Sequence, residues 1–331
     1  MTFIKGLFWN KEESRLRAIY RILIQATIFF ILMKGLAALV GVPDEITAYL
    51  SLGTILILSG IRLFRVLISV WLTGKWIDRR PFSDFGLQIN KKWWGELGFG
   101  LVLGIIMISL IFLVELAAGW ITITDTFFSV RSSGSFFMTF IVYLVLFACV
   151  GFSEELMYRG YFLTNLAEGF NGKTIGPKYA LVLGLIFSSL LFGIFHLGSP
   201  HATFISTLNI VVFGLLFGLS YGLTGRIAIA IGLHTTWNFF QGNVFGFPVS
   251  GVTFPLESAS VFSIQQNGPA LWTGGAFGPE AGLVGLITFV IGVLLLLGWI
   301  RVRRGSIKLD LRLAQPPSNE KEQTKLYVKR S

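Results

Sequence analysis

Residues 136–160 read FFMTFIVYLVLFACVGFSEELMYRG, and this stretch decides the fold of the chain. It begins with an apolar run and ends with two adjacent carboxylates, Glu154 and Glu155, followed by Arg159. A run of about 20 apolar residues is long enough for one helix to cross a lipid bilayer. Ionisable groups at membrane depth are costly to bury, so their presence beside the run indicates a functional site. The stretch therefore predicts a membrane helix that carries polar chemistry.

The composition extends this interpretation to all 331 residues. The chain is 53% hydrophobic and 13% charged, and its mean hydropathy is +0.72. Soluble proteins carry about 25% charged residues, so these values exclude a soluble globule, a nucleic-acid-binding module and a disordered protein. The single cysteine, Cys149, cannot form an internal disulfide. We predict an all-α, polytopic membrane helix bundle.

The distribution of Lys and Arg predicts the topology, because basic residues concentrate in cytoplasmic loops. They occur in the N-terminal arm, in 72–97, in 159–178 and in the tail, whereas the alternate loops are nearly free of them. The segment 242–280 contains neither Lys nor Arg, and we expect it to form an ordered loop on the outer surface. The pattern fits both termini in the cytoplasm and about eight membrane helices, at 19–41, 47–71, 98–121, 136–158, 179–197, 203–223, 227–246 and 281–300.

Four isolated ionisable residues inside these expected helices are interpreted as structural. Arg62 and Arg65 lie near a cytoplasmic end, where long side chains reach the lipid phosphates. Lys34 and Glu115 lie toward the outer ends of their helices. None of the four is expected to do chemistry.

The adjacent carboxylates are a different case. On a continuing helix Glu155 and Arg159 share one face at i, i+4 spacing, where an ion pair is favourable. Glu154 points about 100° away and lacks that partner. A free carboxylate beside a neutralised one suits acid–base catalysis. The alternative is an interfacial cluster that only ends a membrane helix.

Two histidines and an asparagine lie in other apolar helices. His196 follows Phe192 by one turn, and His234 shares a face with Asn238. A single helical histidine is usually a satisfied core residue, but a Glu, two His and an Asn on three helices are harder to explain by packing. Hydrogen bonds between helices are the structural alternative. We take Glu154, His196, His234 and Asn238 as one candidate site.

A row of small residues separates the two histidines. Gly214, Gly218 and Gly222 recur at four-residue spacing, which is typical of a close-packing face in membrane helices. We expect this face to fit beside the helices that bear the histidines, with Asn209 bracing one of them.

These motifs resemble the signature of the CPBP family of intramembrane proteases, which includes the CAAX prenyl endopeptidases and the bacteriocin-processing and self-immunity (Abi) proteins. The resemblance rests on Glu154-Glu155-x-x-x-Arg159, Phe192-x-x-x-His196 and His234-x-x-x-Asn238, in that order. It covers about 138–240, and the expected helices before residue 136 and the tail carry none of it.

Membership would imply hydrolysis of a peptide bond within the membrane. The resemblance implies that Glu154 is the general base that activates water and that His196 is its partner. It also implies that His234 and Asn238 donate hydrogen bonds to the oxyanion. Glu155 and Arg159 would be supporting residues, as would Phe192 and Asn209. The substrate would be a peptide or protein, possibly lipidated or membrane-embedded.

The sequence allows both a metalloprotease and a metal-free glutamate protease, and we favour the metal-free glutamate mechanism. Glu154, His196 and His234 supply the ligand types of a catalytic zinc site, but a ligated Glu154 could not act as the base. We therefore expect no required cofactor, with zinc possible. The competing interpretations are a non-catalytic immunity or scaffold protein and an ion-coupled transporter, since intramembrane Glu and His also mark ion pathways.

The chain divides into four predicted regions. Residues 1–135 hold the N-terminal helices, 136–246 the catalytic core, and 247–300 an outer loop and the last helix, while 301–331 form a basic, disordered tail. That tail and the basic loops would contact anionic lipids at the cytoplasmic face. We expect a multi-pass protein of a bacterial plasma membrane.

The expected helix ends conflict with this site. They place Glu154 near the cytoplasmic side and His196 near the outer end of its helix, too far apart to share a water molecule. We therefore expect the fourth helix to continue past Arg159 to about Glu168, and the fifth to begin several residues before 179.

Overall fold

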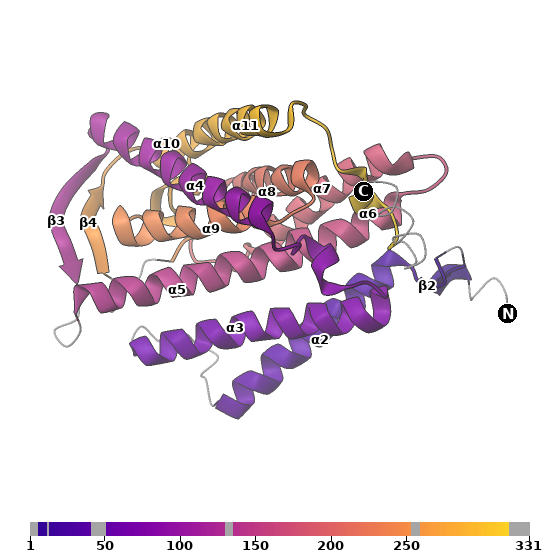
Figure 1. Cartoon of the computed structure of the whole chain (residues 1–331). Coiled ribbons are helices and arrows are strands. Elements are labelled where there is room, and N and C mark those ends of the chain that lie inside the picture. The colour runs from indigo at the N-terminus through magenta and orange to yellow at the C-terminus, as the bar shows by residue number, and fades with distance from the viewer. Residues whose placement is uncertain (1–5, 12, 41–50, 130–134, 253–258, 318–331) are drawn as a thin grey trace.

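A bundle of long helices makes up the protein, as predicted (Figure 1). The computed structural model describes residues 6–11, 13–40, 51–129, 135–252 and 259–317. The α-helices are α2 Ala18–Val40, α3 Leu52–Thr73, α4 Lys91–Ala117, α5 Phe136–Glu155, α6 Thr164–Phe170, α7 Gly176–Phe195, α8 Phe204–Thr224, α9 Ala228–Phe239, α10 Ala270–Thr273 and α11 Leu283–Arg304. The strands are β1 Trp9–Asn10, β2 Arg15–Leu16, β3 Ile121–Ser129 and β4 Ala259–Gln266. Turns of π-helix occur at Gly74–Asp78, Leu156–Leu163 and Phe240–Val244, and 3₁₀ turns at Phe82–Phe85, Gly275–Phe277, Pro279–Ala281 and Leu311–Ala314.

Seven helical segments in the described part of the chain are long and apolar enough to cross a membrane, rather than about eight. The difference is the segment expected at 227–246, whose α-helix, α9, has 12 residues. Nearly all of α9 is buried against α4 and α5, because glycines let the backbones approach. A Cβ on Gly104 would lie 2.6 Å from the carbonyl oxygen of Leu233. This helix is thus a central helix enclosed by the others and not a lipid-facing one.

The fourth expected helix is much longer than its apolar run. Helix α5, the π-helical turn at Leu156–Leu163 and α6 form one segment over Phe136–Phe170, which confirms the predicted continuation past Arg159. Helix α7 begins at Gly176, also earlier than the first estimate. Both changes bring Glu154 and His196 to one level of the bundle.

The described N- and C-terminal segments lie at the same end of the bundle (Figure 1). Arg15 and Arg21 contact Glu168 at 2.7 and 3.0 Å, and Asn171 donates to the carbonyl of Ala314 at 2.7 Å. This arrangement agrees with an alternating topology, whereas the cytoplasmic orientation of this end stays a prediction. Leu313 and Ala314 are buried, so the start of the tail is ordered, contrary to the prediction for 301–331. Residues 318–331 lie outside the described residues.

A two-stranded antiparallel ribbon of β3 and β4 lies at the opposite end (Figure 1). It pairs Ile121 with Gln266 and Ser129 with Ala259. This strand pairing was not predicted, because it joins residues 130 to 145 positions apart. Part of the 242–280 segment also lies against the helices, with Phe245, Phe247 and Val249 buried. The interpretation of this segment as a surface loop was therefore wrong in part.

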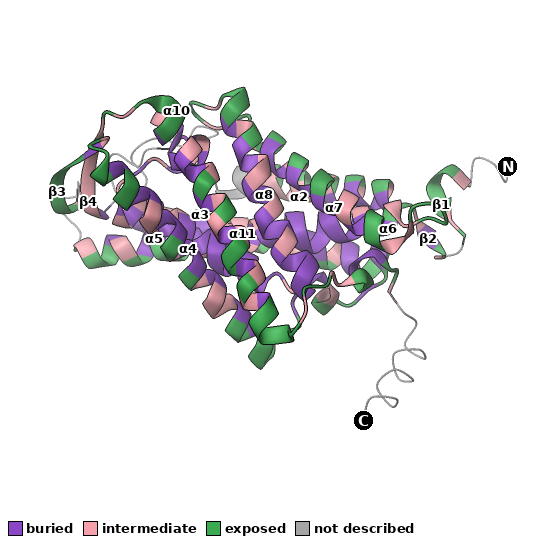
Figure 2. Cartoon of the chain, turned by 90° about the horizontal axis from the view of Figure 1, so that it is seen from above, coloured by how far each residue is buried: buried purple, intermediate pink, exposed green. Residues whose placement is uncertain are grey.

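The glycine row of α8 packs tightly on α7, as expected. A Cβ on Gly214 would lie 3.1 Å from the Cβ of Ser189, and one on Gly218 would lie 2.7 Å from Cδ2 of Leu185. Viewed from above, buried residues are concentrated in the middle of the bundle (Figure 2). Large apolar side chains are exposed on its outside, among them Phe30, Leu113, Ile141 and Leu294, as lipid contact requires.

Candidate active site

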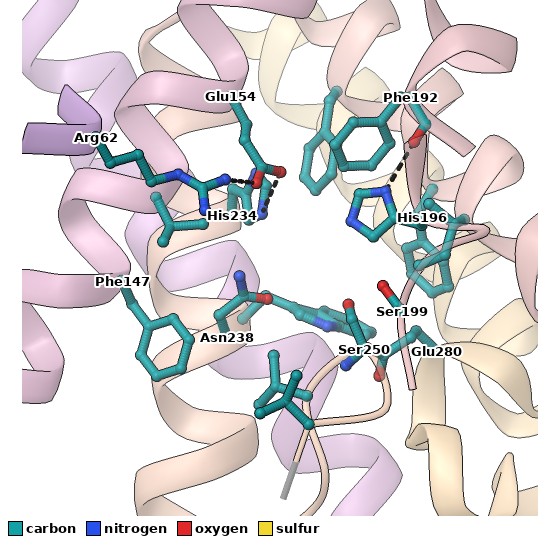
Figure 3. A pocket seen from close by; sticks show the side chains of 17 residues that line it. Arg62, Phe147, Glu154, Phe192, His196, Ser199, His234, Asn238, Ser250 and Glu280 are labelled. Atoms are coloured by element: carbon teal, nitrogen blue, oxygen red, sulfur yellow. Dashed lines mark hydrogen bonds and ion pairs between the residues drawn. The ribbon is translucent and has the colours of Figure 1, made fainter. Parts of the chain in front are cut away.

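A cavity of about 210 Å³ lies among α3, α5, α7, α8 and α9 (Figure 3). It is lined by five of the predicted site residues: Glu154, Phe192, His196, His234 and Asn238. Its walls are otherwise largely apolar, with Phe147, Phe213 and Trp237 among them. The chain thus brings together groups that are up to 84 residues apart in sequence around one cavity.

Glu154 is the member of the carboxylate pair that reaches this cavity. Its side chain is 12% exposed, whereas that of Glu155 is fully buried. Glu154 is not unpartnered, because the guanidinium of Arg62 forms an ion pair with it. The interpretation of Arg62 as a side chain that only reaches lipid phosphates was therefore wrong, since α3 directs it into the bundle toward α5.

Glu155 connects Arg159 to His234. Its Oε1 accepts from the Arg159 guanidinium at 3.0 Å, which confirms the predicted i, i+4 pair, and from Nδ1 of His234 at 2.8 Å. The Nε2 atom of the same imidazole lies 3.8 Å from Oε2 of Glu154. His234 is thus placed between both carboxylates, and its Nδ1 hydrogen bond sets the direction of Nε2.

Arg159 is fully buried and held from several sides. It donates to the carbonyl oxygen of Gly214 at 3.1 Å, and its guanidinium carbon lies 4.3 Å from the ring centroid of Phe192 and 4.9 Å from that of Phe217. The Phe217 ring also stacks on His234, with centroids 5.1 Å apart and 8° between the planes. A Cβ on Gly214 would come within 3.2 Å of the guanidinium, so this glycine makes room for the arginine.

His196 caps the end of α7 and faces the cavity. Its Nδ1 lies 2.7 Å from the carbonyl oxygen of Phe192, which can only accept, so Nδ1 is the donor. In the neutral ring Nε2 is then left as an acceptor toward the cavity. The rings of Phe192 and His196 are in an edge-on contact, with their centroids 4.7 Å apart.

The two predicted asparagines have different surroundings. Asn238 lines the cavity, and its amide has no hydrogen-bond partner among the described residues. Asn209 is buried but does not line the cavity, and within the described part of the chain it makes no hydrogen bond to either histidine. Its predicted bracing role is thus not seen, although Asn209 lies one helical turn before Phe213, on a face of α8 that lines the cavity.

The residues present do not fit a zinc site. Glu154 is held by Arg62, and both nitrogens of His234 face carboxylates. Of the two histidines that line the cavity, only His196 has a ring nitrogen that faces no described side chain or carbonyl group. Over the described ranges of the chain, no three His, Cys, Asp or Glu side chains are grouped as metal ligands.

Several cavity residues were not predicted. The position of Arg62 could have indicated a buried ion pair, because an arginine inside an apolar helix needs a partner. Ser250 and Glu280 come from the 242–280 segment, where no periodic pattern marks them. Glu280 is nonetheless one of only two acidic residues in 242–280, directly before the last apolar run.

Comparison with known proteins places the cavity in a family context. Residues 135–240 match the family described as type II CAAX prenyl endopeptidase Rce1-like. The chain is also 26% identical over 175 residues to the uncharacterized protein YyaK of Bacillus subtilis (strain 168). That match covers 52% of this chain and 54% of YyaK, so the chain spans about half the length of this relative. The motif resemblance is confirmed: the segment 135–240, which supplies Glu154, His196, His234 and Asn238 to the cavity, matches the Rce1-like family of type II CAAX prenyl endopeptidases.

Proposed function

We propose that this protein is an intramembrane endopeptidase in which Glu154 activates a water molecule to hydrolyse a peptide bond. The observation that carries the proposal is the position of Glu154 in the cavity, beside His196, His234 and Asn238. A carboxylate that reaches a cavity together with hydrogen-bond donors is the arrangement that general-base hydrolysis needs.

The proposed reaction begins with a water molecule bound between Glu154 and Nε2 of His196. The Glu154 carboxylate takes one proton as the water oxygen attacks the carbonyl carbon, and the carbonyl oxygen becomes an oxyanion. Nε2 of His234 and the Asn238 amide donate hydrogen bonds to it. Glu154 then returns the proton to the nitrogen of the leaving amine. The C–N bond breaks, and a carboxylic acid and an amine are released; the acid then loses its proton to water.

Two buried groups support these donors. In this proposal His234 carries hydrogen on both ring nitrogens, because Nδ1 donates to Glu155 and Nε2 must donate to the oxyanion. Arg159 neutralises the Glu155 carboxylate that receives this hydrogen bond. Preorganised donors in a water-poor site stabilise a developing oxyanion far more than the same donors in water.

The proposal needs no metal ion, since the carboxylate and both imidazoles already have the contacts that the reaction uses. The substrate is a peptide or protein, and the two forms to test are a prenylated C-terminus and a membrane-embedded segment. We propose that the enzyme is a multi-pass protein of a bacterial plasma membrane, with its basic end against anionic lipids.

The function can be tested with purified protein in liposomes. The substrates are internally quenched peptides that end in a farnesylated cysteine and three further residues, beside unprenylated controls and membrane-spanning peptides. Mass spectrometry of the products locates the cleaved bond. Cleavage within any of the three classes that is lost in Glu154→Gln supports the proposal and identifies the substrate class. Cleavage that persists unchanged in Glu154→Gln contradicts it.

A further inference from the structure

A second polar cluster lies across the cavity from Glu154, at its Ser250 and Glu280 wall (Figure 3). It consists of Gln241, Ser250 and Glu280, which all lie outside the segment matched by the family. Ser250 and Glu280 line the cavity, and the Glu280 residue is 3% exposed. The proposed reaction makes no use of these groups, so their presence in the cavity wall needs its own explanation.

Ser250 belongs to a tight turn whose backbone is strained. Val249 and Val252 exchange two backbone hydrogen bonds, at 3.0 and 2.9 Å, around Ser250 and Gly251. Both central residues have positive φ, +47° for Ser250 and +80° for Gly251. Glycine adopts this conformation without cost, but a serine is uncommon there. The turn therefore depends on contacts that hold Ser250 in place.

Glu280 supplies those contacts. Its Oε1 accepts from the Ser250 backbone N–H at 2.6 Å and from the Ser250 hydroxyl at 3.1 Å. Its Oε2 accepts from the Gln241 amide, which also donates to the carbonyl of Pro248 at 2.5 Å. The carboxylate thus ties the turn at 249–252 to the end of α9 and to the segment before α11.

The turn presents a mixed surface to the cavity. Val249 and Val252 are apolar, and they face the cavity with Phe147 and Trp237. Because the Ser250 hydroxyl donates to Glu280, its oxygen lone pairs remain to accept a hydrogen bond from a peptide N–H. Such a wall suits an aliphatic side chain whose backbone is held by one hydrogen bond.

We propose that Glu280 is a positioning residue that holds the Val249–Val252 turn as the specificity wall of the substrate site. The turn then selects an aliphatic over a polar residue next to the scissile bond. This inference rests on the proposed peptidase function, but its test does not need turnover.

The variants are chosen to separate the contact from its charge. Glu280→Ala removes all three accepted hydrogen bonds, and Ser250→Ala removes only the hydroxyl. Glu280→Gln can keep the contacts, because Oε1 of Gln241 is buried without a described partner and can face the introduced amide after Gln241 rotates. Glu115→Gln is the matched control, because Glu115 is a buried carboxylate that accepts from a glutamine, Gln266, at 3.2 Å outside the cavity.

Hydrogen exchange tests whether Glu280 holds the turn. We expect the amides of 249–252 to exchange faster in Glu280→Ala, and to keep the parent rate in Glu280→Gln and Glu115→Gln. Unchanged exchange of these amides in Glu280→Ala would refute the positioning role.

Peptide binding tests whether the turn selects an aliphatic residue. Each variant is combined with Glu154→Gln, so that the peptide is not cleaved. The probes are two fluorescent farnesylated peptides with Leu or Asn, side chains of similar size, after the cysteine. We expect the Leu peptide to bind about tenfold more tightly or better, with this ratio kept by Glu280→Gln and Glu115→Gln. The ratio should fall toward one in Glu280→Ala and decrease in Ser250→Ala. A ratio unchanged in Glu280→Ala, or near one in the parent background, overturns the specificity wall. Turnover that persists in Glu154→Gln alone refutes the catalytic proposal instead.

Discussion

The Glu155 carboxylate accepts a hydrogen bond of 2.8 Å from Nδ1 of His234, which lies 79 residues later in the chain. Because of this contact, we assign Glu155 a role that differs from that of Glu154. Glu155 directs the imidazole, and Glu154 faces the cavity. Adjacent residues on one helix can divide the work in this way because they point in directions about 100° apart.

Arg159→Ala is expected to lose stability together with rate. The substitution leaves the Glu155 carboxylate buried without its cation, which typically costs about 3–5 kcal/mol. Thermal unfolding in detergent, measured beside the initial rate, checks this. If Arg159→Ala unfolds at the parent temperature yet is inactive, then Arg159 takes part in the chemistry and its structural assignment is wrong.

Asn238→Ala is expected to lower kcat by about 10²–10³, because one donor to the oxyanion is lost. Its thermal stability should stay near that of the parent, since the amide has no partner among the described residues to lose. Asn209→Ala is the matched control, as its side chain lies outside the cavity. Equal loss of rate in both variants would argue against an oxyanion role for Asn238.

Activity is expected to survive exhaustive chelation. The cavity groups are engaged by arginine, carboxylate and backbone partners, and catalytic zinc sites use three protein ligands. Elemental analysis should be run on the same samples as the activity assay. Zinc bound at one equivalent, with activity that is lost on its removal and restored on its return, would make His196 and His234 ligands.

Stability is expected to depend on pH through Glu280. Burial raises the pKa of Glu280 to about 7 in spite of the hydrogen bonds from Ser250 and Gln241. Between its ordinary value of 4.5 and about 7, the unfolded chain has released this proton and the folded chain retains it. The free energy of unfolding therefore falls as pH rises through this window.

The measurement is the Tm from pH 4.5 to 8 for the parent and for Glu280→Gln, which has no proton to release there. As pH rises over this range, we expect the Tm of the parent to fall by several degrees more than the Tm of the variant. The conversion is roughly 2–4 °C for each kcal/mol of unfolding free energy. Parallel curves for the two proteins would show that Glu280 is not the titrating group.

Local patterns in the sequence were sufficient to predict the main features of the site. The lengths of the apolar runs and the i, i+4 spacing of Glu155 and Arg159 depend on a single helix. The need for Glu154 and His196 to meet was enough to predict that the fourth helix continues past Arg159, as it does.

What could not be predicted depends on contacts between distant segments. The pairing of Arg62 with Glu154 joins residues 92 positions apart, and nothing in either helix specifies it. The apolar run that contains α9 is long enough to be counted as a membrane helix, and its burial depends on contacts with α4 and α5. The pairing of β3 with β4 and the Ser250–Glu280 contact have no helical period that would mark them.

The central claim is that Glu154, and not its neighbour, is the general base. It is tested most directly by single-turnover rates of Glu154→Gln and Glu155→Gln on one cleaved peptide, with Tm measured for both. A positioned general base contributes about 10²–10⁴ in rate. We predict that Glu154→Gln loses at least this factor while unfolding like the parent, whereas Glu155→Gln loses stability as well as rate. Full turnover in a folded Glu154→Gln would contradict the account.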